Sequence, residues 1–196
     1  MKFRAAIALV SAVLLSACGL NSVPTAEENA KARWADVQAN YQRRADLVPN
    51  LVATVKGAVA AENKTLTDVV EARAKATSVQ VSADDLTDPA RVQQFQAAQQ
   101  QLSGSLSRLL ATVEAYPELK SQGNFPTLMS QLEGTENRIA IAIRDYNSAV
   151  QAYNTRIRTF PDAIGARIFY GAKPMTPFQA QAGAETAPTV DFGNGL

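Results

Sequence analysis

Apolar residues recur at intervals of three, four or seven along most of the chain, which is the pattern of amphipathic helices. The first such stripe consists of Trp34, Val37, Tyr41, Val48, Leu51, Val55, Val59, Leu66 and Val69. It predicts one continuous helix over about residues 27–77, begun by a capping box of Thr25 and Glu28. Pro49 has no backbone N–H to donate, so a kink is expected at residues 45–49.

Two further stripes follow the polar turn at residues 82–88, and they predict two more long helices. The second stripe consists of Val92, Phe95, Leu102, Leu106, Leu109, Val113 and Tyr116, after Asp88 as N-cap and Pro89 as first helical residue. The third consists of Leu128, Leu132, Ile139, Ile143, Tyr146, Val150, Tyr153, Ile157 and Phe160. Short connections favour antiparallel neighbours. The expected fold is therefore all-α, an elongated antiparallel up-down bundle of three long helices plus a short C-terminal helix over residues 163–169.

Beyond residue 170 the helical pattern stops. Prolines and glycines are frequent there and apolar periodicity is weak, so residues 171–196 are expected to form a flexible tail. Met175 and Phe178 are the residues of this segment with the character to dock on the bundle. The expected organisation is a leader at 1–17, an anchor and tether at 18–26, the bundle at 27–170 and the tail.

The N-terminus indicates membrane attachment. Lys2 and Arg4 precede an apolar run over residues 5–15, and Leu15-Ser16-Ala17-Cys18 follows. This order is typical of a lipoprotein signal peptide with a lipobox, so Cys18 is expected to become the first mature residue and to carry acyl chains such as palmitate. The alternative is an uncleaved anchor helix, although residues 5–20 are fewer than the roughly 20 needed to span a bilayer.

Both forms of attachment place the rest of the chain on the extracytoplasmic side, which is the periplasm where there are two membranes. Inner-membrane lipoproteins commonly carry Asp directly after the lipid-bearing cysteine. This chain has Gly19 there. The outer membrane is therefore favoured if the cell is Gram-negative.

Composition excludes several kinds of chemistry. The chain has no histidine and one cysteine, so it lacks the residues for Ser-His-Asp or Cys-His catalysis, for imidazole metal sites and for thiolate zinc clusters. Nineteen basic residues against eighteen acidic ones give no electrostatic drive towards nucleic acid. The sequence predicts no catalysis, no cofactor, no metal and no nucleic-acid partner.

Several motifs together carry a family resemblance. They are RRADLVPNLVATVKG at residues 43–57, YPELKSQGNF at 116–125, TENRIA at 135–140, and the pairs Tyr146-Asn147, Tyr153-Asn154 and Phe160-Pro161. They resemble the bacterial LemA family over about residues 27–170. The resemblance implies a membrane-attached, extracytoplasmic helical bundle, without an established activity or catalytic residues to carry across. The resemblance implies an uncleaved N-terminal membrane helix in many members. This chain has a lipobox instead, so its expected form of attachment departs from that pattern.

The polar residues of these motifs form the candidate site. Arg44 falls on the first apolar stripe, so we expect it to be partly buried and to pair with Glu136 or Glu133 on an antiparallel neighbour. The carbonyl of Ala45, freed by Pro49, is expected to bond a nearby arginine or Asn50 side chain. The other candidates, for setting helix register or for contacting a partner, are Arg43, Asp46, Asn137, Arg138, Asn147 and Asn154. Asn147 and Asn154 are expected to tie the third helix to the first.

Two classes of function stay open. The first is a membrane-anchored structural or protein-interaction module of the cell envelope, attached through its N-terminal lipid and bound to an unidentified envelope protein. The alternative is a ligand-binding or carboxylate-based enzyme component at the polar seam of the bundle, with Asp46 and Glu136 as its acids. A cleft joining Asp46, Glu136 and Arg44 would favour this alternative. A third class, membrane remodelling by the long helices, is disfavoured because acidic and basic residues alternate on their polar faces.

Overall fold

The computed structural model describes residues 21–57, 63–120 and 123–179, and over these ranges the regular secondary structure is entirely helical. The long helices are α2 (Ser22–Lys56), α3 (Asn63–Ser78), α4 (Pro89–Val113) and α6 (Phe125–Arg156). Three short elements accompany them: the 3₁₀ turn η2 (Asp84–Thr87), α5 (Pro117–Lys120) and α7 (Asp162–Ile168). The expectation of an all-helical protein is confirmed.

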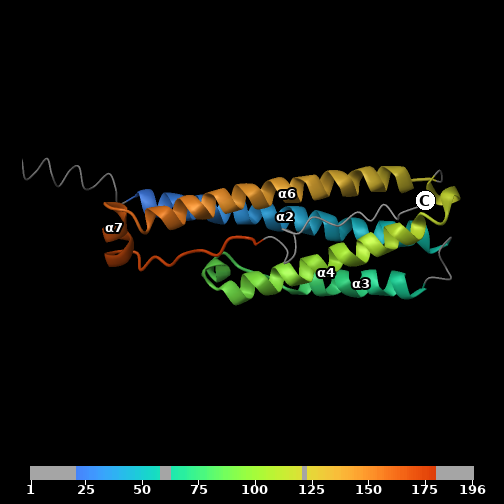
Figure 1. The fold of residues 1–196 in the computed structure, drawn as a ribbon, viewed down its shortest axis with the longest axis horizontal. Helices are drawn as coiled ribbons and strands as arrows, with labels where there is room; N and C mark the ends of the chain where they lie inside the picture. Colours follow the sequence, from blue (N-terminus) through green and yellow to red (C-terminus); the bar gives the residue numbers. More distant parts are fainter. Residues whose placement is uncertain (1–20, 58–62, 121–122, 180–196) are drawn as a thin grey trace, which may run out of the picture.

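The long helices form two antiparallel pairs that lie side by side in an elongated bundle (Figure 1). Helix α2 packs along α6, α3 packs along α4, and α2 also contacts α3. The expected single helix over residues 27–77 is wrong, because α2 ends at Lys56 and α3 returns in the opposite direction. The bundle therefore has four long helices instead of three. A helix that folds back keeps the same apolar period, so the stripe could not reveal the reversal, and Gly57 is its one local signal.

Of the two helix starts predicted from the sequence, one is confirmed and one is wrong. Asp88 caps α4 as expected, since its Oδ1 accepts from the backbone N–H of Ala90 at 2.9 Å and Pro89 is the first helical residue. The capping box of Thr25 and Glu28 is wrong, because α2 already begins at Ser22. The Thr25 hydroxyl lies inside the first turn and donates to the carbonyl of Asn21 at 2.7 Å.

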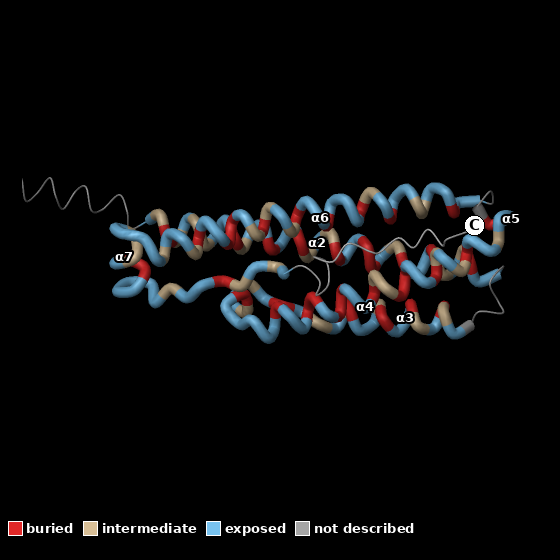
Figure 2. Tube along the Cα trace, in the orientation of Figure 1, coloured by how far each residue is buried: buried red, intermediate tan, exposed pale blue. Residues whose placement is uncertain are grey.

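Buried positions recur along every long helix (Figure 2), and their side chains form two clusters along the rod. The cluster at the α7 end is aromatic, and its ring centroids lie 5.3 Å apart for Trp34 with Phe95 and for Trp34 with Tyr146. The opposite cluster is mainly aliphatic and includes Leu51, Leu102, Leu106, Leu109 and Leu132. Each long helix except the shorter α3 contributes to both clusters. Between the residues of the two clusters lie polar ones: Arg44 on α2, Gln99 on α4 and Glu136 on α6.

After α7 the chain reverses at Gly171, whose φ of 54° suits glycine, and residues 172–178 run back along the bundle. Met175 is buried, Phe178 packs on the aromatic cluster, and the Thr176 N–H donates to the Leu86 carbonyl at 2.8 Å. The expectation of a flexible tail over residues 171–196 is therefore wrong for residues 171–179, which belong to the folded body. Residues 180–196 lie outside the described part of the chain.

Candidate functional site

The polar layer between the two clusters is built around Arg44. This side chain is 1% exposed and lies between Tyr41 and Val48 of α2. Its Nη1 donates to the Ser103 hydroxyl at 2.6 Å and to Glu136 Oε1 at 3.1 Å. Its Nη2 donates to the backbone oxygen of Gln99 at 3.0 Å and to the Oε1 of the same residue at 2.8 Å. The expected pairing of Arg44 with Glu136 is therefore present.

Gln99 extends this cluster to the remaining long helix. It is 5% exposed, and its Nε2 donates to the Ala76 carbonyl of α3 at 3.2 Å. Arg44 from α2, Gln99 and Ser103 from α4, and Glu136 from α6 thus connect all four long helices through hydrogen bonds. We call these four residues the Arg44 junction. Its guanidinium is satisfied at both terminal nitrogens, while the buried Nε has no partner.

The junction is closed on the apolar side by Tyr41. The Arg44 guanidinium carbon lies 4.9 Å from the centre of the Tyr41 ring, within the range of a cation–π contact. Burial raises the pKa of Tyr41 to about 12, and the nearby Arg44 charge opposes part of that rise. Tyr41 is therefore a neutral phenol at physiological pH and offers no base.

A second polar contact replaces a backbone hydrogen bond that α2 lacks beside the junction. Pro49 lies inside α2, so the carbonyl of Ala45 has no i+4 backbone donor. Arg73 of α3 supplies one through its Nε, 2.7 Å from that oxygen. From the sequence, an arginine of the same motif or Asn50 was expected to bond this carbonyl. The donor instead comes from the neighbouring helix, which the assumption of one continuous helix had placed far away.

The remaining candidate residues of the motifs at residues 43–57 and 135–140 face outward, whereas Thr135 of the second motif is buried. Arg43, Asp46 and Asn50 are exposed on α2, and Asn137 and Arg138 are exposed on α6. The Asp46 carboxylate accepts from Gln42 Nε2 at 2.8 Å, whereas Glu136 is engaged by Arg44. The two carboxylates proposed for acid–base work therefore have separate partners on opposite sides of α2.

A cavity of about 320 Å³ adjoins the junction between α2, α3 and α4. Its polar lining comes chiefly from amides, with Gln38, Gln42, Gln80 and Gln99 beside Tyr41 and Phe95. No carboxylate lines it, and Tyr41 is the titratable side chain in its lining. The lining therefore offers hydrogen-bonding groups and no general base at physiological pH. The cavity does not join Asp46, Glu136 and Arg44.

The two Tyr-Asn pairs of α6 hold residues 172–178 in place. Asn147 donates to the Phe178 carbonyl at 3.0 Å and accepts from its N–H at 2.8 Å. Asn154 makes the same pair of bonds with Met175, at 2.8 and 2.9 Å. The Tyr146 hydroxyl donates to the Thr176 carbonyl at 2.8 Å, and the Tyr153 hydroxyl donates to the Lys173 carbonyl at 3.1 Å. We call this set the Tyr-Asn clamp.

The clamp corrects the expectation that Asn147 and Asn154 tie the third helix to the first. The seven-residue spacing was informative, because it places both pairs on one face of α6. The partner was missed because an extended segment has no periodic signal. An asparagine side chain can donate to the C=O and accept from the N–H of one extended residue. Tyr-Asn pairs repeated every seven residues therefore indicate an extended segment packed along that face of the helix.

Nothing in the described ranges adds a metal site or a membrane span. No cluster of three or more Asp, Glu, His or Cys side chains suited to hold a metal ion is found among those residues. No helix there is both long and apolar enough to cross a membrane. Cys18 and its lipobox lie outside these ranges, so its lipidation stays a prediction from the sequence.

The fold and the site define an all-α bundle protein whose polar signature residues hold helices together. The model of the LemA family matches residues 33–192, and the chain belongs to that family. The match continues past the boundary drawn at residue 170, in agreement with the clamped segment.

Three relatives extend this finding. The magnetosome protein MamQ 2 of Paramagnetospirillum magneticum is 26% identical over 157 residues, 72% of this chain and 58% of that protein. Protein LemA of Metamycoplasma hominis is 26% identical over 124 residues, 63% of this chain and 52% of that protein. The magnetosome protein MamQ of Magnetospirillum gryphiswaldense is 24% identical over 171 residues, 79% of this chain and 63% of that protein. The chain spans less than two thirds of the length of each.

Proposed function

We propose that this LemA-family chain is a membrane-anchored structural and interaction module of the cell envelope, without catalysis of its own. The observation that carries the proposal is the Arg44 junction. A buried arginine with a carboxylate and two amide or hydroxyl partners is the kind of group an active site uses, yet here four helix-to-helix hydrogen bonds occupy it. A buried polar network of this kind fixes the register of packed helices. The junction thus supports a rigid rod.

Attachment supports the same proposal. Cys18 is separated from Ser22, the first residue of α2, by three residues. Acyl chains on Cys18 would hold the start of α2 close to the bilayer, and the rod would extend from there into the periplasm, at the outer membrane of a Gram-negative cell. Several acyl chains give stable anchoring where one gives weak binding.

The surface proposed to meet an envelope protein is the outer side of the motif at residues 43–57. Arg43, Asp46 and Asn50 are spaced by three and four residues, which places them on one exposed face of α2. Arg44 in the same stretch is buried, so the motif combines an inner structural residue with outer polar ones. Charged side chains on a rigid helix face favour specific, orientation-dependent recognition over bulk hydrophobic association.

Site-specific photocrosslinking in intact cells tests this surface. A photoreactive residue at position 43 is expected to yield one crosslinked envelope protein, and a matched residue at position 64, an exposed lysine of α3, is expected to yield none. Asp46→Lys should abolish the crosslink from position 43 without changing the melting temperature, because Asp46 is exposed. Equal crosslinking from both positions, or none from either, would contradict the proposed surface.

The alternative, a ligand-binding component at the polar seam, has one observation in its favour, the cavity of about 320 Å³ beside Gln99. Its amide lining would suit a small polar ligand. Measuring the melting temperature of the purified protein against periplasmic small-molecule extracts tests it, since a ligand that binds only the folded state raises that temperature. A rise that Gln99→Leu abolishes would support the alternative, and no rise would count against it.

A further inference from the structure

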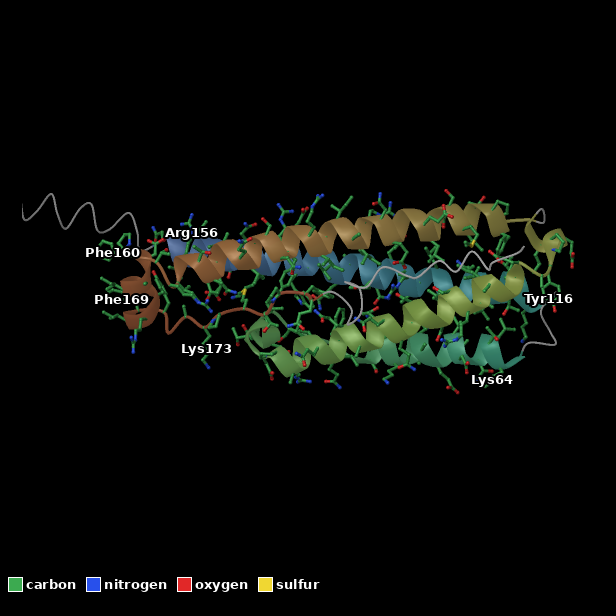
Figure 3. All side chains as sticks on the ribbon, in the orientation of Figure 1. Lys64, Tyr116, Arg156, Phe160, Phe169 and Lys173 are labelled. Carbon is green, nitrogen blue, oxygen red and sulfur yellow. The ribbon has the colours of Figure 1, made fainter. Side chains whose placement is uncertain are left out.

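The end of the rod that carries α7 exposes apolar side chains. Phe160 is 82% exposed, Ile168 is 69%, Phe169 is 68% and Ile164 is 52%. All four lie within a span of ten residues, on and beside α7, and Figure 3 shows Phe160 and Phe169 at the α7 end of the described bundle. Large apolar side chains gathered at one place on a surface mark a site of contact with another apolar phase.

Basic side chains surround this apolar end. We define the α7 tip as residues 156–173, which hold Arg156, Arg158, Arg167 and Lys173 against one acid, Asp162. Asp162 lies 3.9 Å from Arg156, so three cations stay uncompensated within the tip. The rest of the chain beyond residue 4 has the opposite balance, with thirteen basic residues against seventeen acidic ones. The positive charge is therefore concentrated in this segment, although Glu27 of α2 and Asp84 line a hollow together with Lys173.

A hollow of about 770 Å³ combines both features. Ile157, Ile164 and Ile168 contribute its apolar surface, and Arg158 and Arg167 contribute its cationic groups. A phospholipid likewise joins apolar acyl chains to an anionic phosphate. Side chains that combine apolar and cationic groups lie at the boundary between lipid headgroups and acyl chains.

The position of the tip identifies the occupant. Helix α2 contacts α7, and Figure 1 shows the start of α2 beside α7 at the same end of the rod. The chain from Cys18 to Ser22 can extend over at most about 14 Å. Attachment through Cys18 therefore holds the α7 tip close to the membrane surface. We propose that the α7 tip inserts Phe160, Ile164, Ile168 and Phe169 into the interface of an anionic bilayer, with its arginines on lipid phosphates.

This second contact rests on the proposed attachment and specifies it further. A rod held to the membrane at one point can adopt many angles, whereas attachment at one point combined with an inserted tip fixes the angle. The outward polar face of α2 would then stand at a defined orientation above the bilayer. Anionic lipid favours the inserted state by about fivefold for each basic residue near the surface.

The full-length protein reconstituted into vesicles tests the proposal. A fluorophore sensitive to polarity is attached at Ile168→Cys, with Val70→Cys of α3 as a control, because Val70 is also apolar and 51% exposed. Wild-type chain treated with the same dye serves as the blank for Cys18. In vesicles with phosphatidylglycerol, the label at position 168 should shift to the blue and be quenched by a quencher placed in the acyl chains. The label at position 70 should stay in water.

Charge and occupancy are tested with the same label. The double variant Arg158→Gln, Arg167→Gln should reduce insertion into anionic vesicles by about 25-fold. Replacing the anionic vesicles by phosphatidylcholine alone should remove most of the insertion of the unaltered tip. Both arginines are exposed, so the variant should fold like the parent. A label at position 168 that stays in water, or shielding that is equal on phosphatidylcholine, overturns the proposal. Shielding that follows protein density instead of lipid composition indicates a second copy and also overturns it. A chain that does not fractionate with membranes contradicts the attachment itself.

Discussion

Arg73 of α3 donates its Nε to the carbonyl of Ala45 on α2, the oxygen that Pro49 leaves without a helical partner. One side chain thus compensates for a break in the backbone of its neighbour. The contact also records the reversal of the chain after α2, because a straight helix would hold residues 45 and 73 far apart.

Arg73→Met should therefore destabilise the bundle by about 1 to 3 kcal/mol, the cost of a polar group left without its partner. Pro49→Ala supplies the missing backbone N–H, so the same Arg73→Met change should cost less in that background. Urea unfolding of the four proteins of this double-mutant cycle measures the difference. Equal costs in both backgrounds would show that Arg73 does not serve the Ala45 carbonyl.

The Arg44 junction predicts an order of effects. Arg44→Lys keeps the charge but loses the planar donor set that reaches Gln99 and Ser103, so it should cost about 2 to 4 kcal/mol of unfolding free energy. Glu136→Gln should cost about 1 kcal/mol or less, because the Glu136 side chain is 46% exposed and water screens its charge.

Arg43→Lys is the matched control for Arg44→Lys, since Arg43 is the exposed neighbour in the same motif. It should change the unfolding free energy by no more than about 0.5 kcal/mol. If both Arg→Lys changes have the same small effect in urea unfolding, the junction does not hold the four helices in register.

The Tyr-Asn clamp predicts amide protection at two positions. Asn147→Ala should remove both bonds to Phe178 and speed hydrogen exchange of its N–H, as should Asn154→Ala for Met175. Asn147→Asp keeps the acceptor for the Phe178 N–H and removes the donor to its carbonyl. Exchange in that variant should be intermediate. Fast exchange of both amides in the unaltered protein would show that residues 172–178 are not held.

Alkaline unfolding follows from Tyr41. Burial raises its folded-state pKa to about 12 from an ordinary value of 10.0, so the folded state keeps a proton that the unfolded state releases. Stability from this group is complete below pH 10 and is lost between about pH 10 and 12, at up to about 1.4 kcal/mol per pH unit. Tyr41→Phe should leave stability near neutral pH almost unchanged and make this decline less steep. Tyr146, whose pKa burial also raises, contributes in the same sense.

Sequence periodicity predicted those features that depend on one helix at a time. The stripes identified most core residues of α4 and α6, although Phe160 at the end of the third stripe is exposed. Heptad phase predicted a partly buried Arg44 paired with Glu136 or Glu133, and the structure has Glu136 as the partner. The pairing of Arg73 with Ala45 could not be predicted, because the stripe keeps its period through a reversal of direction. Gln99 was missed for a related reason: it belongs to a glutamine-rich helix face that composition assigns to solvent, and the four-helix packing buries it. Ser103, which is half-buried, gave no apolar signal of its own.

The central claim of membrane anchoring depends on Cys18, and intact mass spectrometry of the protein purified from cell membranes tests it most directly. The account predicts a mature chain that begins at Cys18, with Lys2 and Arg4 removed and a mass increase equal to a diacylglyceryl group and an N-acyl chain. A chain that retains residues 1–17, or one whose Cys18 carries no lipid, would contradict the lipoprotein form of anchoring.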